Sequence, residues 1–140
     1  MKRVRSARVG LPQYRALATF RYELRRFIRY SERLVRRHGL TPLQYQLLLQ
    51  IKGYPRRDAV TMGEMAERLQ AKQHGVSALA RRCEKLGLVK RYKRRARGED
   101  RRSVYLTLSA KGERLLEPLV QLHLDELNSS GRRFRPPRLR

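Results

Sequence analysis

Apolar residues recur at helical spacing in the first third of the chain. Between residues 13 and 38 they stand three, four or seven positions apart, at Leu17, Phe20, Leu24, Phe27, Ile28, Leu34 and Val35. This spacing predicts one long amphipathic helix, preceded by a flexible basic arm over residues 1–12. Gly39 follows the last apolar positions and is well placed to end the helix.

Two capping motifs predict where the next helices begin. Thr41-Pro42-Leu43-Gln44 and Thr61-Met62-Gly63-Glu64 both place a threonine three residues before a Gln or Glu, which is the capping-box pattern. The first motif predicts a helix that ends near Gly53. The second predicts a short helix whose apolar face carries Met65, Ala66 and Leu69.

A break near residues 70–72 separates this short helix from another, predicted over 73–86 and ended by Gly87. A short helix, a turn and a second helix form a helix-turn-helix pattern, whose second helix enters the major groove of DNA. The residues predicted to face inward are Val76, Leu79, Ala80 and Cys83. The outward residues, our candidates for DNA contact, are Gln73, His74, Ser77, Ala78 and Arg81. Taken alone, these outward positions also fit a solvated surface.

A β-hairpin is predicted directly after this helix. Residues 88–93 form a plausible strand, residues 104–108 are rich in β-branched, aromatic and apolar side chains, and a charged loop containing Gly98 joins them. Such a hairpin forms a basic wing over residues 89–108, able to follow phosphates or insert arginine into the minor groove. The wing residues predicted to contact DNA are Lys93, Arg94, Arg95, Arg97, Asp100, Arg101 and Arg102. A solvated charged turn is the alternative.

The last part of the chain predicts one more helix and a tail. Ser109 can cap a helix over 109–128 that carries Leu115, Leu116 and Leu119. The tail, residues 129–140, is rich in arginine and proline and is predicted to be disordered. The fold class expected is therefore mainly α with a small β-hairpin: a winged helix-turn-helix over 41–108 between two flanking helices.

Charge narrows the class of partner. The 140 residues include 35 Lys and Arg against 12 Asp and Glu, a net charge of +23, which attracts polyanions such as DNA, RNA or an anionic membrane. Arginines interrupt every hydrophobic run near the N-terminus, and no apolar stretch reaches the length of a membrane span. We therefore expect a cytoplasmic, nucleoid-associated protein without a membrane partner.

The predicted elements resemble those of the MarR-type (multiple-antibiotic-resistance regulator) transcription factors. The matching segments are 40–45, 65–69, 83–91, 100–102 and 104–112. The most specific part lies in the wing, where Asp100-Arg101-Arg102, a strand and Leu108-Ser109-Ala110-Lys111-Gly112 are similar to the family's wing signature. The resemblance covers roughly residues 14–127 in the family's order of elements.

The resemblance implies a homodimer that binds a pseudo-palindromic DNA operator and usually represses transcription. It assigns dimerisation to the helices at 13–38 and 109–128, and minor-groove contact to Arg102, which Asp100 would orient. It also implies release from DNA by a small anionic or aromatic ligand. Two positions depart from the family pattern: Lys72 replaces the usual Ser or Thr cap, and Cys83 replaces a common Leu. After Leu127 the family's last dimerising helix is largely missing.

Other candidate chemistry is weak. A single cysteine, Cys83, allows no internal disulfide and is interpreted as a core residue in preference to a redox switch. His38, His74 and His123 are scattered without metal-ligand spacing, so no metal or other cofactor is expected. No nucleophile–base pair, phosphate-binding loop or paired carboxylate motif is present, and we do not expect an enzyme.

Two functions are compatible with the sequence, beside a third possibility for which it shows no chemistry: a regulator controlled by a ligand or partner in a cleft. The first is a dimeric, sequence-specific transcriptional regulator on double-stranded DNA, a repressor in the usual mode of the family. The second is a general polyanion-binding protein, associated with the nucleoid or RNA, without a specific operator. The capped helix-turn-helix favours the first function, because binding that ignores sequence does not need a recognition helix. The basic arm and tail favour the second.

Overall fold

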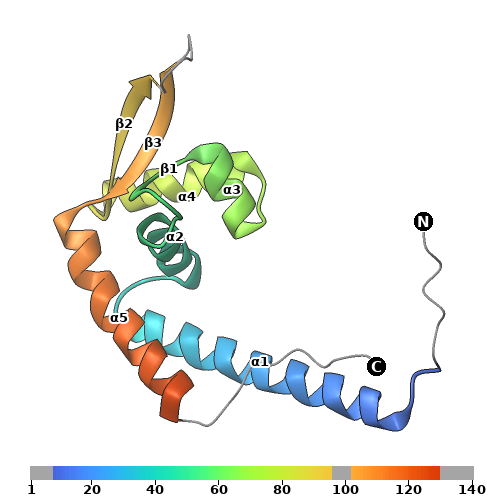
Figure 1. Cartoon of the computed structure of the whole chain (residues 1–140). Helices are drawn as coiled ribbons and strands as arrows, with labels where there is room; N and C mark the ends of the chain where they lie inside the picture. Colours follow the sequence, from blue (N-terminus) through green and yellow to red (C-terminus); the bar gives the residue numbers. More distant parts are fainter. Residues whose placement is uncertain (1–7, 96–101, 130–140) are drawn as a thin grey trace.

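The structure is a computed structural model that describes residues 8–95 and 102–129. Its elements, in chain order, are α1 (Leu11–Arg37), α2 (Pro42–Lys52), β1 (Ala59–Thr61), α3 (Met62–Leu69), α4 (Gln73–Lys85), β2 (Val89–Arg95), β3 (Arg102–Leu108) and α5 (Ala110–Ser129). The predicted fold class is confirmed: a mainly helical chain carries a winged helix-turn-helix between two flanking helices (Figure 1).

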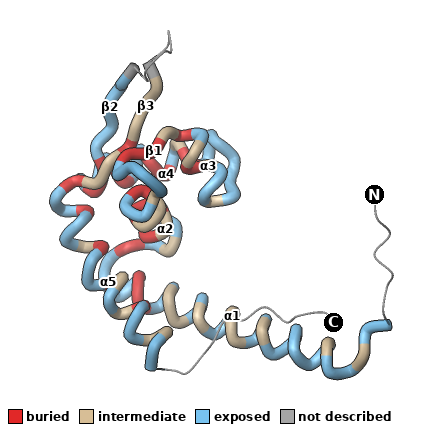
Figure 2. Tube along the Cα trace, in the orientation of Figure 1, coloured by how far each residue is buried: buried red, intermediate tan, exposed pale blue. Residues whose placement is uncertain are grey.

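The molecule has two ends with different characters. Helices α2, α3 and α4 surround the base of the small sheet, and the β2–β3 hairpin projects from this lobe (Figure 1). At the other end lies α1, and α5 runs from the base of the hairpin down to it (Figure 1). Figure 2 shows buried residues gathered in the lobe, whereas the N-terminal half of α1 is mostly exposed.

A single apolar core holds the lobe together. Fully buried side chains from α2, α3, the sheet and α5 contribute to it, among them Leu47, Leu48, Ile51, Met65, Val60, Leu106 and Leu119. From α4, the four residues predicted to face inward, Val76, Leu79, Ala80 and Cys83, are all buried. The helical spacing in the sequence therefore predicted the inner face of the recognition helix correctly.

The sheet differs from the predicted hairpin in two ways. It has a third strand, β1, and the strand order is β1-β3-β2 with both pairs antiparallel. The predicted strands 88–93 and 104–108 were too short at the wing end, because the ladder continues until Arg95 pairs with Arg102. Backbone hydrogen bonds make this ladder, so a run of charged side chains does not end it.

The predicted helix starts at the two capping boxes are confirmed. Thr41 Oγ1 accepts a hydrogen bond from the Gln44 N–H at 3.2 Å, and Gln44 Oε1 accepts one from the Thr41 N–H at 2.9 Å. Thr61 and Glu64 repeat this exchange at 3.2 and 3.0 Å. Both pairs satisfy backbone donors that the first helical turn leaves without partners.

The beginning of α1 corrects one expectation. We predicted a basic arm over 1–12 and a helix from 13, but α1 begins at Leu11 and includes Pro12. Gln13 Oε1 accepts a hydrogen bond from the Gly10 N–H at 3.0 Å, and proline is well suited to the first helical turn. The rest of the predicted arm, residues 1–7, lies outside the described residues, as does the predicted tail from 130 onward.

Glycines end α1 and α4 as predicted. Gly39 has φ +82° and Gly87 has φ +74°, the left-handed backbone conformation that favours glycine. The next residue then donates back into the last turn, Leu40 N to Val35 O at 3.2 Å and Leu88 N to Cys83 O at 2.9 Å. The chain therefore leaves α4 directly into β2, and this exit places the wing beside the recognition helix.

The start of α5 is fitted tightly against the base of the wing. Ser109 N donates to Leu88 O at 3.0 Å, and Gly112 N donates to Ser109 Oγ at 3.0 Å, which confirms the predicted serine cap.

Within the described residues, no helix is both long and apolar enough to cross a membrane.

Candidate nucleic-acid interface

The outward face of α4 is open to solvent. Gln73, His74, Ala78 and Arg81 are exposed, and Ser77 is half-buried. Lys72 occupies the capping position without a capping hydrogen bond from its side chain, and the helix still begins at Gln73 as predicted. The first turn of α4 therefore presents amide and imidazole groups together with helix N–H groups, and Arg81 lies two turns further along the same helix.

The turn between α3 and α4 sets the angle between these helices. Gln70 has φ +50°, and Ala71 N donates to Ala66 O at 3.0 Å. Gln70 Nε2 also donates to Glu67 O at 2.8 Å, so the side chain supports a backbone conformation that is costly for a residue other than glycine.

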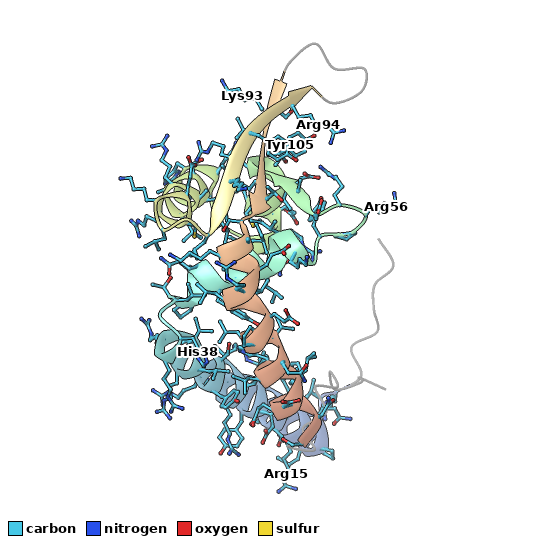
Figure 3. All side chains as sticks on the ribbon, turned by 90° about the vertical axis from the view of Figure 1, so that its left-hand side faces the viewer. Arg15, His38, Arg56, Lys93, Arg94 and Tyr105 are labelled. Carbon is cyan, nitrogen blue, oxygen red and sulfur yellow. The ribbon has the colours of Figure 1, made fainter. Side chains whose placement is uncertain are left out.

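The basic residues of β2 lie on both faces of the wing. Along β2, Lys93 projects to one side of the hairpin and Arg94 to the other (Figure 3). Tyr92 lies directly opposite Tyr105 in the ladder, and their rings stack at 5.8 Å with 17° between planes. This cross-strand pair stiffens the ribbon that carries Lys93 and Arg94, both of which are exposed.

An ion pair connects the wing to the recognition helix. Arg91 Nε lies 3.1 Å from Glu84 Oε2, so the base of β2 is joined to the outer surface of α4. Both side chains are partly exposed, and such a pair contributes little to stability. Its effect is on geometry, because it restricts how the wing is oriented relative to the face of α4.

The sequence did not predict a cluster of arginine and tyrosine side chains around Glu64. Glu64 accepts a hydrogen bond from the Tyr54 hydroxyl at 2.7 Å and forms an ion pair with Arg57. The Arg57 guanidinium lies over the rings of Tyr54 and Tyr105, at 5.2 and 5.8 Å. Arg68 covers Tyr54 at 5.8 Å. The cluster joins α3 to β3, and no sequence signal shows that these distant positions meet.

Glu64 is ionised within this cluster. Burial raises the pKa of its carboxyl group, but hydrogen bonds from Thr61, Tyr54 and Arg57 outweigh burial, so the pKa lies below its ordinary value. The carboxylate thus caps α3 and holds Arg57 in place at neutral pH.

The predicted tip of the wing is only partly within the described residues. Arg97, Asp100 and Arg101 lie outside them, so the hypothesis that Asp100 orients Arg102 stays a prediction. The backbones of Arg95 and Arg102 pair as the last rung of the ladder. The backbone of Arg102 therefore begins β3 in a regular antiparallel pair.

The three histidines, His38, His74 and His123, lie in different parts of the fold. His123 is buried where α1, α2 and α5 meet: its Nε2 lies 2.6 Å from Ser31 Oγ, and its ring stacks on Tyr45 at 4.9 Å. His38 follows the end of α1, and His74 lies on α4. Among the described residues, no group of three or more His, Cys, Asp or Glu side chains could hold a metal ion.

Cys83 is expected to be unreactive in the folded protein. The residue is fully buried, and burial raises the pKa of its thiol to about 11. A thiol with this pKa is only about one part in a thousand thiolate at pH 8. We expect iodoacetamide at pH 8 to modify the native protein at least 100-fold more slowly than the protein in guanidinium.

The same shift makes stability depend on pH in the alkaline range. The pKa of the thiol in the folded protein is above the ordinary value of 9.0. The contribution of the buried, neutral thiol to the free energy of unfolding is therefore complete below pH 9, and it is lost as the pH rises toward 11.

For the alkylation experiment with iodoacetamide, equal rates in native and unfolded protein would contradict the burial of this thiol.

Comparison with known proteins agrees with this geometry. Residues 38–103 match the model of the MarR family. An HTH-type transcriptional regulator of Bacillus cereus is 32% identical over 87 residues, which cover 62% of this chain and 53% of that protein. One from Bacillus anthracis matches over the same length with 32% identity and the same coverage. The chain spans about half the length of the curated relatives it matches.

Solved structures share the fold at lower identity. A MarR family protein from Bacillus stearothermophilus aligns with a TM-score of 0.70 and 22% identity, covering 89% of this chain and 86% of that one. MepR, a transcription regulator of the Staphylococcus aureus multidrug efflux pump MepA, aligns with a TM-score of 0.67 and 22% identity, covering 80% and 78%. A MepR mutant bound to an oligodeoxyribonucleotide aligns with a TM-score of 0.63 and 23% identity, covering 81% and 78%.

Proposed function

We propose that the chain is a MarR-type, homodimeric, sequence-specific regulator of transcription that acts as a repressor, because residues 38–103 match the model of that family and include its winged helix. Helix α4 of each subunit enters the major groove, and the wing contacts the adjacent minor groove. The relatives matched in sequence are described as transcriptional regulators, in line with a chain that is not an enzyme.

One observation carries this proposal. The exposed face of α4, with Gln73, His74 and Arg81, stands beside a basic two-stranded ribbon, and the Arg91–Glu84 ion pair joins the two. Glutamine can pair bidentately with adenine, and arginine with guanine. The lysines and arginines of the ribbon supply contacts to phosphates, which dominate affinity without reading sequence.

The exposed apolar side chains of the flanking helices support the dimer. On α1, Leu17 and Ile28 are 51% and 46% exposed, and Leu124 on α5 is 48% exposed. A second copy of the chain would cover such residues, and would place two recognition helices about one turn of DNA apart. Release by a small anionic or aromatic ligand belongs to this proposal through the family resemblance alone.

The deciding experiment selects bound sequences from a random pool of duplexes at near-physiological salt. We expect a pseudo-palindrome to be enriched, with two half-sites about one helical turn apart. Recovery of an unenriched pool would reject a sequence-specific regulator and favour the alternative, a general polyanion-binding protein. The net charge of +23 is the observation that supports that alternative.

Arg102 is expected to contribute one phosphate or minor-groove contact at the wing tip. We predict that Arg102→Ala weakens operator binding and lowers the slope of log affinity against log salt by about one. Titrations of the selected operator at several salt concentrations measure both effects. Unchanged affinity and slope would remove Arg102 from the interface.

A further inference from the structure

The flanking helix α1 carries a continuous row of arginines. Eight arginines lie along it, and all of them are exposed: Arg15, Arg21, Arg25, Arg26, Arg29, Arg33, Arg36 and Arg37. With about 100° of rotation per residue, all eight fall within roughly 160° of the helix circumference. We call this surface the arginine stripe. From first to last arginine it extends roughly 33 Å along the helix axis at about 1.5 Å per residue.

The stripe is poorly balanced by acids. Glu32 lies within the same arc, and Glu126 of α5 lies beside Arg29 and Arg33. Glu23 lies outside the arc and reaches Arg26 at 4.0 Å. Arginines also follow one another at intervals of four residues from Arg21 to Arg37, and like charges at this spacing destabilise a helix. An anionic partner would remove this repulsion.

The stripe lies on the side of α1 opposite its contact with α5. The opposite side of α1 packs on α5, where Ser31 Oγ lies 2.6 Å from His123 Nε2 and the Phe27 ring lies 6.0 Å from that of His123. Figure 3 shows Arg15 at the far end of the molecule from Lys93 and Arg94. A duplex seated on α4 and the wing would therefore lie at the opposite end of the molecule from Arg15.

We propose that the arginine stripe binds a second DNA duplex, so that the protein bridges two DNA segments. The inference rests on the proposed function, which supplies the first duplex. Arginine forks fit phosphate bidentately, and the length of the stripe is close to the roughly 34 Å of one turn of DNA. The backbone of a duplex presents phosphates all along that length.

An anionic membrane fits the stripe less well. A helix that lies in a membrane surface buries its apolar face in lipid, with the basic residues above it. In α1 that face is already engaged near its C-terminal end, where Leu34 and Val35 are buried and Phe27 packs on His123. The helix cannot lower this side into lipid without leaving α5. A rigid polyanion on the opposite, arginine-bearing side requires no such rearrangement.

The test measures capture of a second duplex. A biotinylated duplex carrying the selected operator is fixed to beads and saturated with the 140-residue chain, and a fluorescent duplex of unrelated sequence is then added. The stripe variant combines Arg15→Gln, Arg33→Gln and Arg37→Gln, which lie on the side of α1 away from Ile28. We expect it to bind the first duplex within two-fold of wild type, and to capture at least ten-fold less of the second. The salt slope of capture should fall by about three.

Two matched controls separate the stripe from net charge and from folding. Replacing the same three arginines with lysine keeps the charge, and should keep most of the capture. Removing three cations elsewhere, by Lys52→Gln, Lys111→Gln and Arg114→Gln at exposed positions near the α2–α5 contact, should leave capture within two-fold of wild type. Sedimentation of each variant checks that its oligomeric state is that of the wild type.

The outcomes are distinct. Failure of the wild type to bind the first duplex would overturn the proposed function. Binding of the first duplex with no capture of the second, or equal capture by wild type and stripe variant, would overturn the bridging inference alone. Binding of phosphatidylglycerol vesicles that is lost in the stripe variant, with no capture of a second duplex, would assign the stripe to an anionic membrane and would also overturn it.

Discussion

Replacing Gly112 with alanine is expected to destabilise the fold by about 3 kcal/mol or more, at the upper end of the effects of overpacking. A Cβ at this position would overlap the Leu88 carbonyl oxygen and lie 3.1 Å from Leu88 C. Both atoms belong to the backbone, so no side chain can turn aside to make room. Thermal unfolding should show a melting temperature lower by roughly 10 °C.

Gly112→Ala is expected to be destabilising because α5 is in tight contact with the base of the wing. Ser109 N donates to Leu88 O, the same atom that the new methyl group would strike. The first turn of α5 would have to move outward, and this bond would be strained or lost. Gly112 is the glycine of the segment that resembles the wing signature of the MarR type, and this close approach gives that glycine a physical role.

Gly63→Ala is the matched control for this prediction. Gly63 is exposed in the first turn of α3, and a Cβ there meets nothing within 4 Å. Alanine is the better helix former, so the same change should stabilise the fold by roughly 0.5 kcal/mol. Equal destabilisation by both substitutions would show that the Leu88 contact does not explain the effect of Gly112→Ala.

Arg81→Ala is expected to have the largest effect on sequence recognition. If the Arg81 guanidinium pairs bidentately with guanine, its loss should cost about 1–3 kcal/mol of binding, or about 5- to 150-fold in affinity. The loss should be confined to operators that carry the preferred base, so discrimination at one position in each half-site should decrease. Titration of the selected operator and of single-base variants measures both effects.

Lys93→Ala is the matched control for Arg81→Ala, because it should weaken binding without changing sequence preference. Lys93 is an exposed cation on one face of the wing, and a contact to phosphate from it carries no sequence information. Its removal should weaken binding to all duplexes by a similar factor, with a salt slope lower by about one. If Arg81→Ala behaved in the same way, Arg81 would be a phosphate contact and the selectivity would have to come from Gln73, His74 or Ser77.

The local elements could be predicted because their causes are local. Thr41 and Thr61 start helices through partners three residues away, and the inward face of α4 follows from the spacing of apolar residues. The strand β1 could not be predicted, because three residues are too few to show a period. It exists because Val60 lies opposite Leu106 of β3, at a separation in sequence that no local pattern reports.

The sequence by itself determined the order of helices and strands, the strong positive charge and the outward residues of the recognition helix. These depend on spacing and composition, which act over a few residues. Only the tertiary structure decided that Arg57 and Glu64 join β3 to α3, that Gly112 rests on the Leu88 carbonyl, and that the side of α1 opposite its arginines packs on α5. Each of these depends on which surfaces of distant segments meet, and that is settled by packing in the folded chain.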